Sequence, residues 1–145
     1  MSQPIVDQLS TLLASTYTLS LKTQNFHWNV TGPMFTSLHT LFEIQYNELA
    51  TAVDEIAERI RTLGVRAPAS YSEFAALSVV EENSVDISAT DMVRELAQDQ
   101  QKIADLANTL VGIAGEAQDE ATASIATDRL LVHEKAGWML RSHLD

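Results

Sequence analysis

Apolar residues recur at every third or fourth position in four long stretches of the chain, which is the spacing of one face of an α-helix. The stretches run from residue 5 to 29, from about 34 to 63, from 88 or 90 to between 112 and 115, and from about 119 to 143. The interval 65–87 has no such pattern and is rich in serine. It predicts a long connection that holds one short helix at about 72–76.

Residues at the ends of these stretches favour helix termini. Gly32 and Pro33 separate the first stretch from the second, and Gly64 follows the second as a stop signal. Ser88 or Thr90 is suited to cap the third stretch, because a hydroxyl accepts a hydrogen bond from the free amides of a first turn.

The lengths of the connections predict how the helices are arranged. Only 65–87 is long enough to cross a bundle, so the second and third helices would run in the same direction. One long crossover within four helices is the ferritin-like arrangement. We therefore expect an all-α fold, a ferritin-like four-helix bundle with a short helix in the long middle connection, formed as a single domain by residues 1–145.

Composition agrees with helices and excludes several other classes. Only 5 glycines and 3 prolines occur among 145 residues of which 46% are hydrophobic, which argues against an all-β or a disordered chain. The absence of cysteine excludes disulfide scaffolds and thiolate metal sites. No basic leader and no apolar run of about 20 residues is present. We expect a cytoplasmic protein that does not enter a membrane.

The charge of the chain disfavours nucleic acid as a partner. The net charge is -11, and no Lys or Arg precedes Lys22. DNA binding depends on cationic side chains that replace condensed counterions. An acidic surface attracts cations instead.

A stripe of metal-ligating residues follows the second helix. His39, Glu43, Asp54 and Glu58 fall within about 100° of one another on a helical wheel, beside the apolar face. Ionisable groups at the border of a buried face are costly unless they are paired or bind something. Together with His27 they form a candidate site for a borderline metal ion.

The spacing of these residues predicts a dimer. His39 and Asp54 lie 15 residues apart, or about 22 Å along a helix, so they cannot bind one ion within one chain. A shared site requires the second helices of two subunits to lie antiparallel, which creates two equivalent sites. Leu41, Ile44 and Ala52 are expected to supply the additional apolar surface for this pairing.

Specific motifs extend this interpretation over nearly the whole chain. The segment KTQNFHWNVTGPMFTSLH at 22–39, the run DEIAER at 54–59 and the ending HEKAGWMLRSHL at 133–144 resemble the Dps family, the DNA-binding proteins from starved cells. The resemblance implies a hollow homo-dodecamer built from two-fold dimers that oxidises Fe(II), preferentially with hydrogen peroxide, and stores the ferric mineral as protection against oxidative damage.

The resemblance also implies roles for individual residues. His27 and His39 would come from one subunit, and Asp54 and Glu58 from its partner. Glu43 stands where relatives have a further acidic group, often Asp, and would either bind the metal directly or hold one of its ligands in place. Trp28 would donate an electron or absorb a radical, or simply pack in the core; both can hold.

Acidic residues near the last helix match a pore in this family. The resemblance places Asp119 and Asp128 at a three-fold iron entry pore, with Ser124 where some relatives have an acid. The alternative is that Asp119 and Glu120 only complement the helix dipole. Two further residues on the second helix, Glu48 and Glu55, would face either the cavity or solvent, and His133 and His143 are not assigned to metal.

Three other functions remain open from the sequence. A DNA-compacting nucleoid protein is disfavoured by the acidic charge and the lack of basic residues before Lys22. A conventional ferritin would have Glu-x-x-His pairs for a site inside one bundle, and no Glu here has His three residues on. A shell that only sequesters metal would keep the same ligands, and Zn(II) or Mn(II) would suit them as well.

Overall fold

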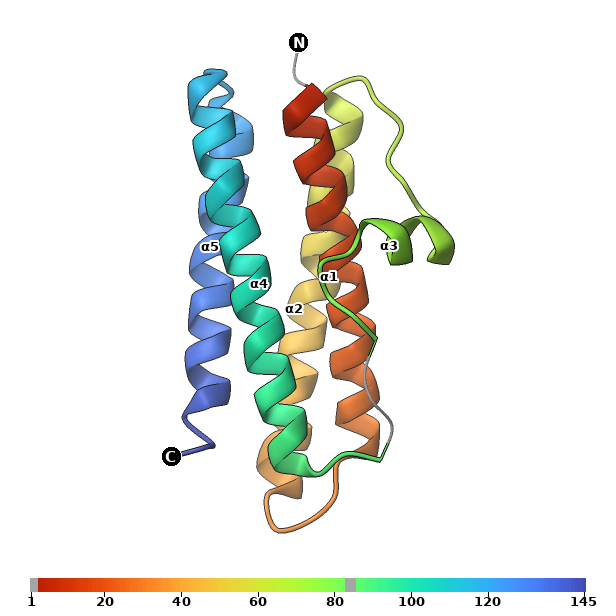
Figure 1. The fold of residues 1–145 in the computed structure, drawn as a ribbon, viewed down its shortest axis with the longest axis vertical. Coiled ribbons are helices and arrows are strands. Elements are labelled where there is room, and N and C mark those ends of the chain that lie inside the picture. Colours follow the sequence, from red (N-terminus) through yellow and green to blue (C-terminus); the bar gives the residue numbers. More distant parts are fainter. Residues whose placement is uncertain (1–2, 83–85) are drawn as a thin grey trace.

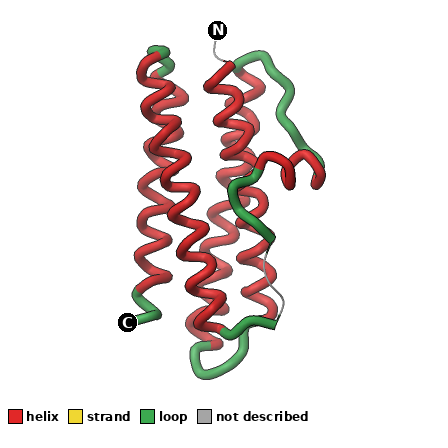
Figure 2. The backbone as a smooth tube through the Cα atoms, in the orientation of Figure 1, coloured by secondary structure: helices red, strands yellow, loops and turns green. Residues whose placement is uncertain are grey.

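The structure is a computed structural model that describes residues 3–82 and 86–145. Within these residues the chain is helical, with no strand (Figures 1 and 2). The helices are α1 (Gln3–Asn29), α2 (Phe35–Thr62), α3 (Tyr71–Leu77), α4 (Ala89–Glu116) and α5 (Glu120–Arg141). The expected helices are confirmed, and their bounds differ from the predicted ones by few residues.

The four long helices form a bundle in which α1 packs against α2, and α4 against α5 (Figure 1). The chain reverses between α1 and α2 and again between α4 and α5, whereas α2 and α4 run in the same direction. The long crossover between them carries α3 along the side of α1. This topology confirms the predicted ferritin-like bundle with a short helix in its middle connection.

The core is one cluster of apolar side chains from all five helices and the adjoining loops. On α2 the buried face is wider than the sequence indicated: Leu41 is 7% exposed and Ala52 is 3% exposed. Both pack inside their own bundle, so the expectation that they cover a second subunit is wrong. Ile44, which is 61% exposed, is the one of the three that is available to a neighbour. No described helix is both long and apolar enough to cross a lipid bilayer.

Side-chain caps define where two of the four long helices begin. The hydroxyl of Ser88 accepts a hydrogen bond from the Asp91 amide at 3.1 Å, so Ser88, and not Thr90, caps α4. Asp119 caps α5 by accepting from the Thr122 amide at 3.0 Å. Each cap satisfies an amide that has no partner within its helix.

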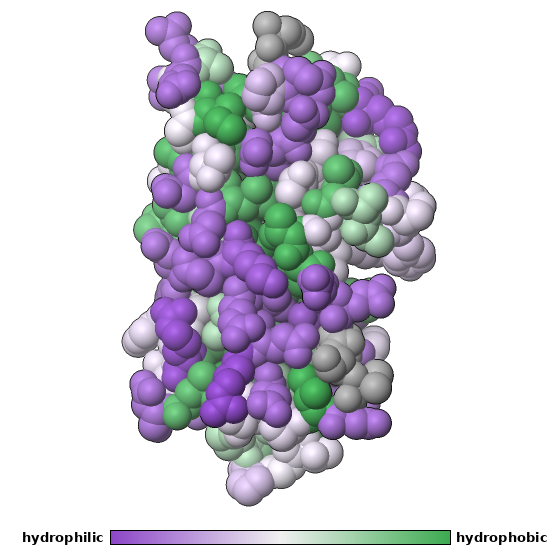
Figure 3. All heavy atoms as spheres, viewed as in Figure 1, coloured by the Kyte–Doolittle hydropathy of each residue, from purple (hydrophilic) through white to green (hydrophobic). Residues whose placement is uncertain are grey.

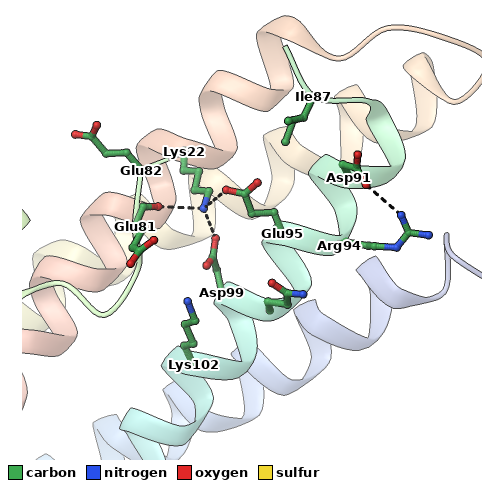
Figure 4. A pocket seen from close by; sticks show the side chains of 10 residues that line it. Lys22, Glu81, Glu82, Ile87, Asp91, Arg94, Glu95, Asp99 and Lys102 are labelled. Carbon is green, nitrogen blue, oxygen red and sulfur yellow. Dashed lines mark hydrogen bonds and ion pairs between the residues drawn. The ribbon is translucent and has the colours of Figure 1, made fainter. Parts of the chain in front are cut away.

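Lys22, a buried residue of α1, links the crossover to α4 through a hydrogen bond and two ion pairs (Figure 4). Its Nζ lies 2.7 Å from a carboxylate oxygen of Glu95 and 2.7 Å from one of Asp99, both on α4. It also donates to the carbonyl of Glu81 in the crossover at 3.0 Å. Burial raises the pKa of Asp99, and the Lys22 ammonium opposes this shift without cancelling it. The surrounding face is strongly hydrophilic over much of its lower half (Figure 3).

Replacing this lysine is expected to destabilise the fold strongly. Lys22→Met leaves the Asp99 carboxylate buried without its cation, which costs about 3 kcal/mol of unfolding free energy. Urea denaturation at pH 7 measures the loss, and a second substitution, Asp99→Asn, should recover part of it. Lys102→Met is the matched control, because Lys102 lines the same pocket but is exposed. Equal midpoints for the two lysine variants would contradict the assignment.

Candidate metal centre

His27 and His39 meet where α1 ends and α2 begins. His27 occupies the last turn of α1, and His39 lies near the start of α2, which returns alongside α1. The two imidazole rings stack with centroids 3.8 Å apart and planes 13° from parallel. His27 and His39, which lie on either side of the turn between α1 and α2, are thus in direct contact.

The two histidines exchange hydrogen bonds with each other's backbone. His27 Nδ1 lies 2.6 Å from the carbonyl oxygen of His39, and His39 Nδ1 lies 2.8 Å from the carbonyl oxygen of His27. A carbonyl oxygen only accepts, so each Nδ1 must carry a proton. In the neutral rings each Nε2 then keeps its lone pair, the form in which imidazole binds a metal.

Aromatic and acidic groups surround this pair. Phe35 stacks on His39 with centroids 4.9 Å apart, and Tyr46 lies 5.3 Å from His27 in a tilted arrangement. A carboxylate oxygen of Glu43 lies 3.7 Å from His27 Nε2, on a side chain that is 53% exposed. Glu43 is therefore close enough to join an ion bound at His27. Trp28 is 62% exposed, so it does not pack in the core of this chain.

Asp54 and Glu58 lie further along α2, on its exposed face. They line a shallow depression of about 390 Å³ together with Thr51, Glu55, Arg59, Thr62 and Ile125. Within residues 3–82 and 86–145 of one chain, no three His, Asp or Glu side chains converge as metal ligands. The histidine pair, which joins α1 to α2, and the carboxylate pair of α2 are therefore separate groups within one chain. Their union across subunits remains a prediction.

Arg59, the cationic residue that follows Glu58, pairs with residues at the start of α5 and not with the site carboxylates. Arg59 donates to the Asp119 carboxylate at 2.8 Å and to the Thr122 hydroxyl at 3.0 Å. Burial acts to raise the pKa of Asp119, but hydrogen bonds from Thr122 and the charge of Arg59 outweigh it and hold that pKa below its usual value. Arg59 thus pairs with α5 and leaves the Asp54 and Glu58 carboxylates free of an ion pair within the described chain.

The predicted pore residues lie in different environments. The Asp119 carboxylate already caps α5 and pairs with Arg59, which is the structural role that the sequence left open for it. Asp128, Glu120 and Ser124 are exposed on α5. Only Asp128 presents a carboxylate at a pore position with no ion pair among the described residues. The three-fold pore itself remains a prediction.

A buried polar network on the other side of α2 was not anticipated. Arg129 of α5 donates to both carboxylate oxygens of Glu48 and, from Nη2, to Nε2 of His133 at 3.1 Å. His133 Nδ1 in turn donates to Gln100 of α4 at 2.6 Å. Glu48 is therefore an ion-pair partner, whereas Glu55 lies exposed by the Asp54 depression. The available signal was the i,i+4 pair of Arg129 and His133.

Comparison with known proteins places this geometry in a family. The family model of the ferritin-like domain matches residues 6–145. A low temperature-induced protein of Nostoc is 41% identical over 145 residues, which cover 99% of this chain and 81% of that protein. DNA protection during starvation protein 2 of Bacillus anthracis is 34% identical, covering 100% of this chain and 99% of the relative.

Solved structures agree with these relatives. Dps from Staphylococcus aureus superposes with a TM-score of 0.97 at 36% identity, covering 99% of this chain and 97% of that one. A Dps protein from Vibrio cholerae, described as a member of a broad superfamily of ferritin-like diiron-carboxylate proteins, gives a TM-score of 0.94 at 31% identity, covering 99% and 91%. The chain belongs to the Dps family of ferritin-like proteins.

Proposed function

We propose that this protein is a ferroxidase and iron-storage protein. Two subunits share each oxidation site: His27 and His39 of one chain bind Fe(II) together with Asp54 and Glu58 of the other. Twelve chains form a hollow shell in which the ferric product is stored. The similarity to solved structures supports the general function in iron chemistry, since one of these proteins is described as a member of the ferritin-like diiron-carboxylate superfamily.

The exchange of hydrogen bonds between His27 and His39 is the observation that carries the assignment to these residues. Both Nδ1 atoms are occupied by carbonyl oxygens, so two Nε2 lone pairs are directed away from them. A pair of stacked histidines held only for packing would not need both rings in this form. The imidazoles suit Fe(II), and exposed carboxylates complete a harder ligand set that also suits Fe(III).

The proposed oxidant is hydrogen peroxide, used as a two-electron acceptor. Two Fe(II) ions each lose one electron, the O–O bond breaks, and with two waters the products are two FeO(OH) units and four protons. No hydroxyl radical is released when both electrons arrive together. Trp28, which is exposed beside His27, is proposed to supply an electron when only one iron is present. A titration of Fe(II) with peroxide should consume one peroxide for two irons.

DNA compaction is not part of this proposal. Twelve chains of net charge -11 give a shell with a net charge of roughly -130, which repels the polyanion DNA at physiological salt. Zn(II) or Mn(II) would bind the same nitrogen and oxygen ligands and are expected to inhibit iron oxidation.

Removing the histidine pair tests the site. His27→Ala combined with His39→Ala is expected to slow Fe(II) oxidation by peroxide by about 100-fold, because the ion loses both nitrogen ligands. Ferric absorbance after mixing measures the rate, and size-exclusion chromatography checks that the particle still assembles.

Two further variants make this test specific. Asp54→Asn with Glu58→Gln should slow oxidation similarly, and these exposed positions can change without disturbing the core. His143→Ala is the control, since His143 lies after the end of α5, far along the chain from both the histidine pair and the carboxylate pair. Wild-type rates in either double variant would refute the proposed ligands.

A further inference from the structure

The reversal between α1 and α2 turns on a residue with left-handed backbone geometry. Gly32 has a φ of +102°, a region that L side chains rarely adopt. Its carbonyl accepts the Phe35 amide at 3.0 Å and so helps to begin α2. Residues 30–34 are the whole connection between the two helices that carry His27 and His39.

Both sides of this turn are anchored in the core. Val30 is 1% exposed and donates from its amide to the Phe26 carbonyl at 2.9 Å, which extends the ladder of α1. Leu38, in the first turns of α2, is fully buried. Because both sides of the turn are held, a substitution that disfavours this φ at Gly32 strains the contacts between the end of α1 and the start of α2.

That strain would fall on the hydrogen bonds between the histidines. They are the contacts that join His27 to His39 across the reversal, and their lengths of 2.6 and 2.8 Å leave little tolerance. The carbonyl of His27 lies in the last turn of α1, where helical carbonyls lack an amide partner, and His39 Nδ1 fills that need. The turn geometry and the protonation of both rings are therefore linked.

We propose that Gly32 is a positioning residue for the metal centre. Its left-handed backbone sets the register at which His27 and His39 exchange hydrogen bonds, and this register fixes two unprotonated Nε2 atoms for a borderline divalent cation. The inference rests on the proposed function only in taking these histidines as ligands. It adds that the affinity of the site depends on a backbone angle seven residues before His39.

The surroundings of Gly32 allow the backbone angle to be tested by itself. A Cβ added at Gly32 would meet no atom within 4 Å, so alanine there introduces strain in φ without a clash. Gly64 offers a matched control at the opposite end of α2: its φ is +89°, and a Cβ there also meets nothing within 4 Å. Gly32→Ala and Gly64→Ala therefore impose the same kind of strain at two ends of one helix.

Cobalt(II) binding measures the effect without iron or peroxide. Absorbance of the visible bands of bound Co(II) should show at least tenfold weaker binding in Gly32→Ala than in the wild type. Gly64→Ala should bind within twofold of the wild type, although both variants unfold at similarly lowered temperatures. If Gly32→Ala does not assemble, Gly32→Asn is used, since asparagine tolerates a left-handed backbone better.

The protonation of the rings gives a second readout that a general loss of stability would not move. The chain has 4 histidines, so solid-state NMR of protein labelled with ¹⁵N at histidine can assign each ring by substitution. In the wild type near pH 8, His27 and His39 should be protonated at Nδ1 and bare at Nε2. In Gly32→Ala one or both should change to the Nε2-protonated form, whereas Gly64→Ala should match the wild type.

The outcomes separate this inference from the proposed function. Equal Co(II) affinity and unchanged tautomers in Gly32→Ala would overturn the positioning role, even if iron oxidation proceeds as proposed. Equal losses in Gly32→Ala and Gly64→Ala would also overturn it, because strain alone would then explain them. A third outcome is that the wild type has both rings protonated at Nδ1 and only Gly32→Ala loses Co(II) affinity, but the wild type does not oxidise iron. That result would uphold the positioning role and refute the ferroxidase.

Discussion

Two variants that are each inactive should regain about a quarter of the wild-type oxidation rate when they are assembled together. The first carries His27→Ala with His39→Ala, and the second carries Asp54→Asn with Glu58→Gln. In a mixed dimer the second chain supplies intact histidines and the first supplies intact carboxylates. One of the two sites is then complete, and the other lacks every ligand.

The expected fraction follows from two-fold symmetry. Random pairing makes half of the dimers mixed, and each mixed dimer has one of its two sites restored. A site within one chain would give no recovery at all, because every chain in the mixture lacks half of its ligands. The distance of about 22 Å between His39 and Asp54 along α2 is the physical reason to expect recovery.

The measurement requires that chains exchange during assembly. The two variants are unfolded together, refolded as a mixture, and assayed for Fe(II) oxidation by peroxide. Mixing the assembled particles without unfolding is the control, and it should leave both inactive. A refolded mixture of His27→Ala, His39→Ala chains with wild-type chains calibrates the yield. Absence of recovery in a mixture that demonstrably contains mixed particles would contradict the shared site.

Helical periodicity and spacing predicted much of this molecule, because they report on local geometry. The bounds of α2 and the crossover before α4 follow from apolar spacing and from Gly64. The separation of His39 from Asp54 needed only the rise of a helix. These are properties of a single helix or connection, and a sequence specifies them directly.

Contacts between helices could not be predicted in the same way. A helical wheel placed Leu41 and Ala52 outside the apolar stripe, but α2 packs between neighbours and buries both. The exchange of hydrogen bonds between His27 and His39 depends on the turn at Gly32, which a pattern of residue types does not show. The ion pair of Glu48 with Arg129 joins residues 81 positions apart. Each of these depends on how helices are placed against one another.

Acid should destabilise the bundle through His133. This ring is 1% exposed and lies between Arg129 and Gln100, with Glu48 beyond the arginine. Burial, and then the positive charge of Arg129, lower the pKa of His133 from 6.5 to about 3. A protonated ring could not accept the hydrogen bond from Arg129 and would place a second cation beside it.

The sign of the effect follows from the two states. In the unfolded chain His133 takes up a proton below about pH 6.5, whereas in the folded chain it stays neutral down to about pH 3. Acid therefore favours the unfolded chain in this window. The stability contributed by the neutral ring is complete above pH 6.5. As the pH decreases from 6.5 to about 3, the free energy of unfolding falls by about 1.4 kcal/mol per pH unit, up to about 5 kcal/mol in total.

A histidine-to-glutamine comparison isolates this ring from the many carboxylates of the chain. His133→Gln can accept from Arg129 and donate to Gln100 but does not titrate, so its guanidinium midpoint should fall less steeply between pH 7 and pH 4. All proteins are compared at one subunit concentration, because assembly adds to apparent stability. His143→Gln, at a half-buried ring beyond the end of α5, should retain the wild-type slope. Parallel curves for the wild type and His133→Gln would mean that the network tolerates the added charge. Steeper loss in the wild type would show that the folded bundle requires a neutral His133 between Arg129 and Gln100.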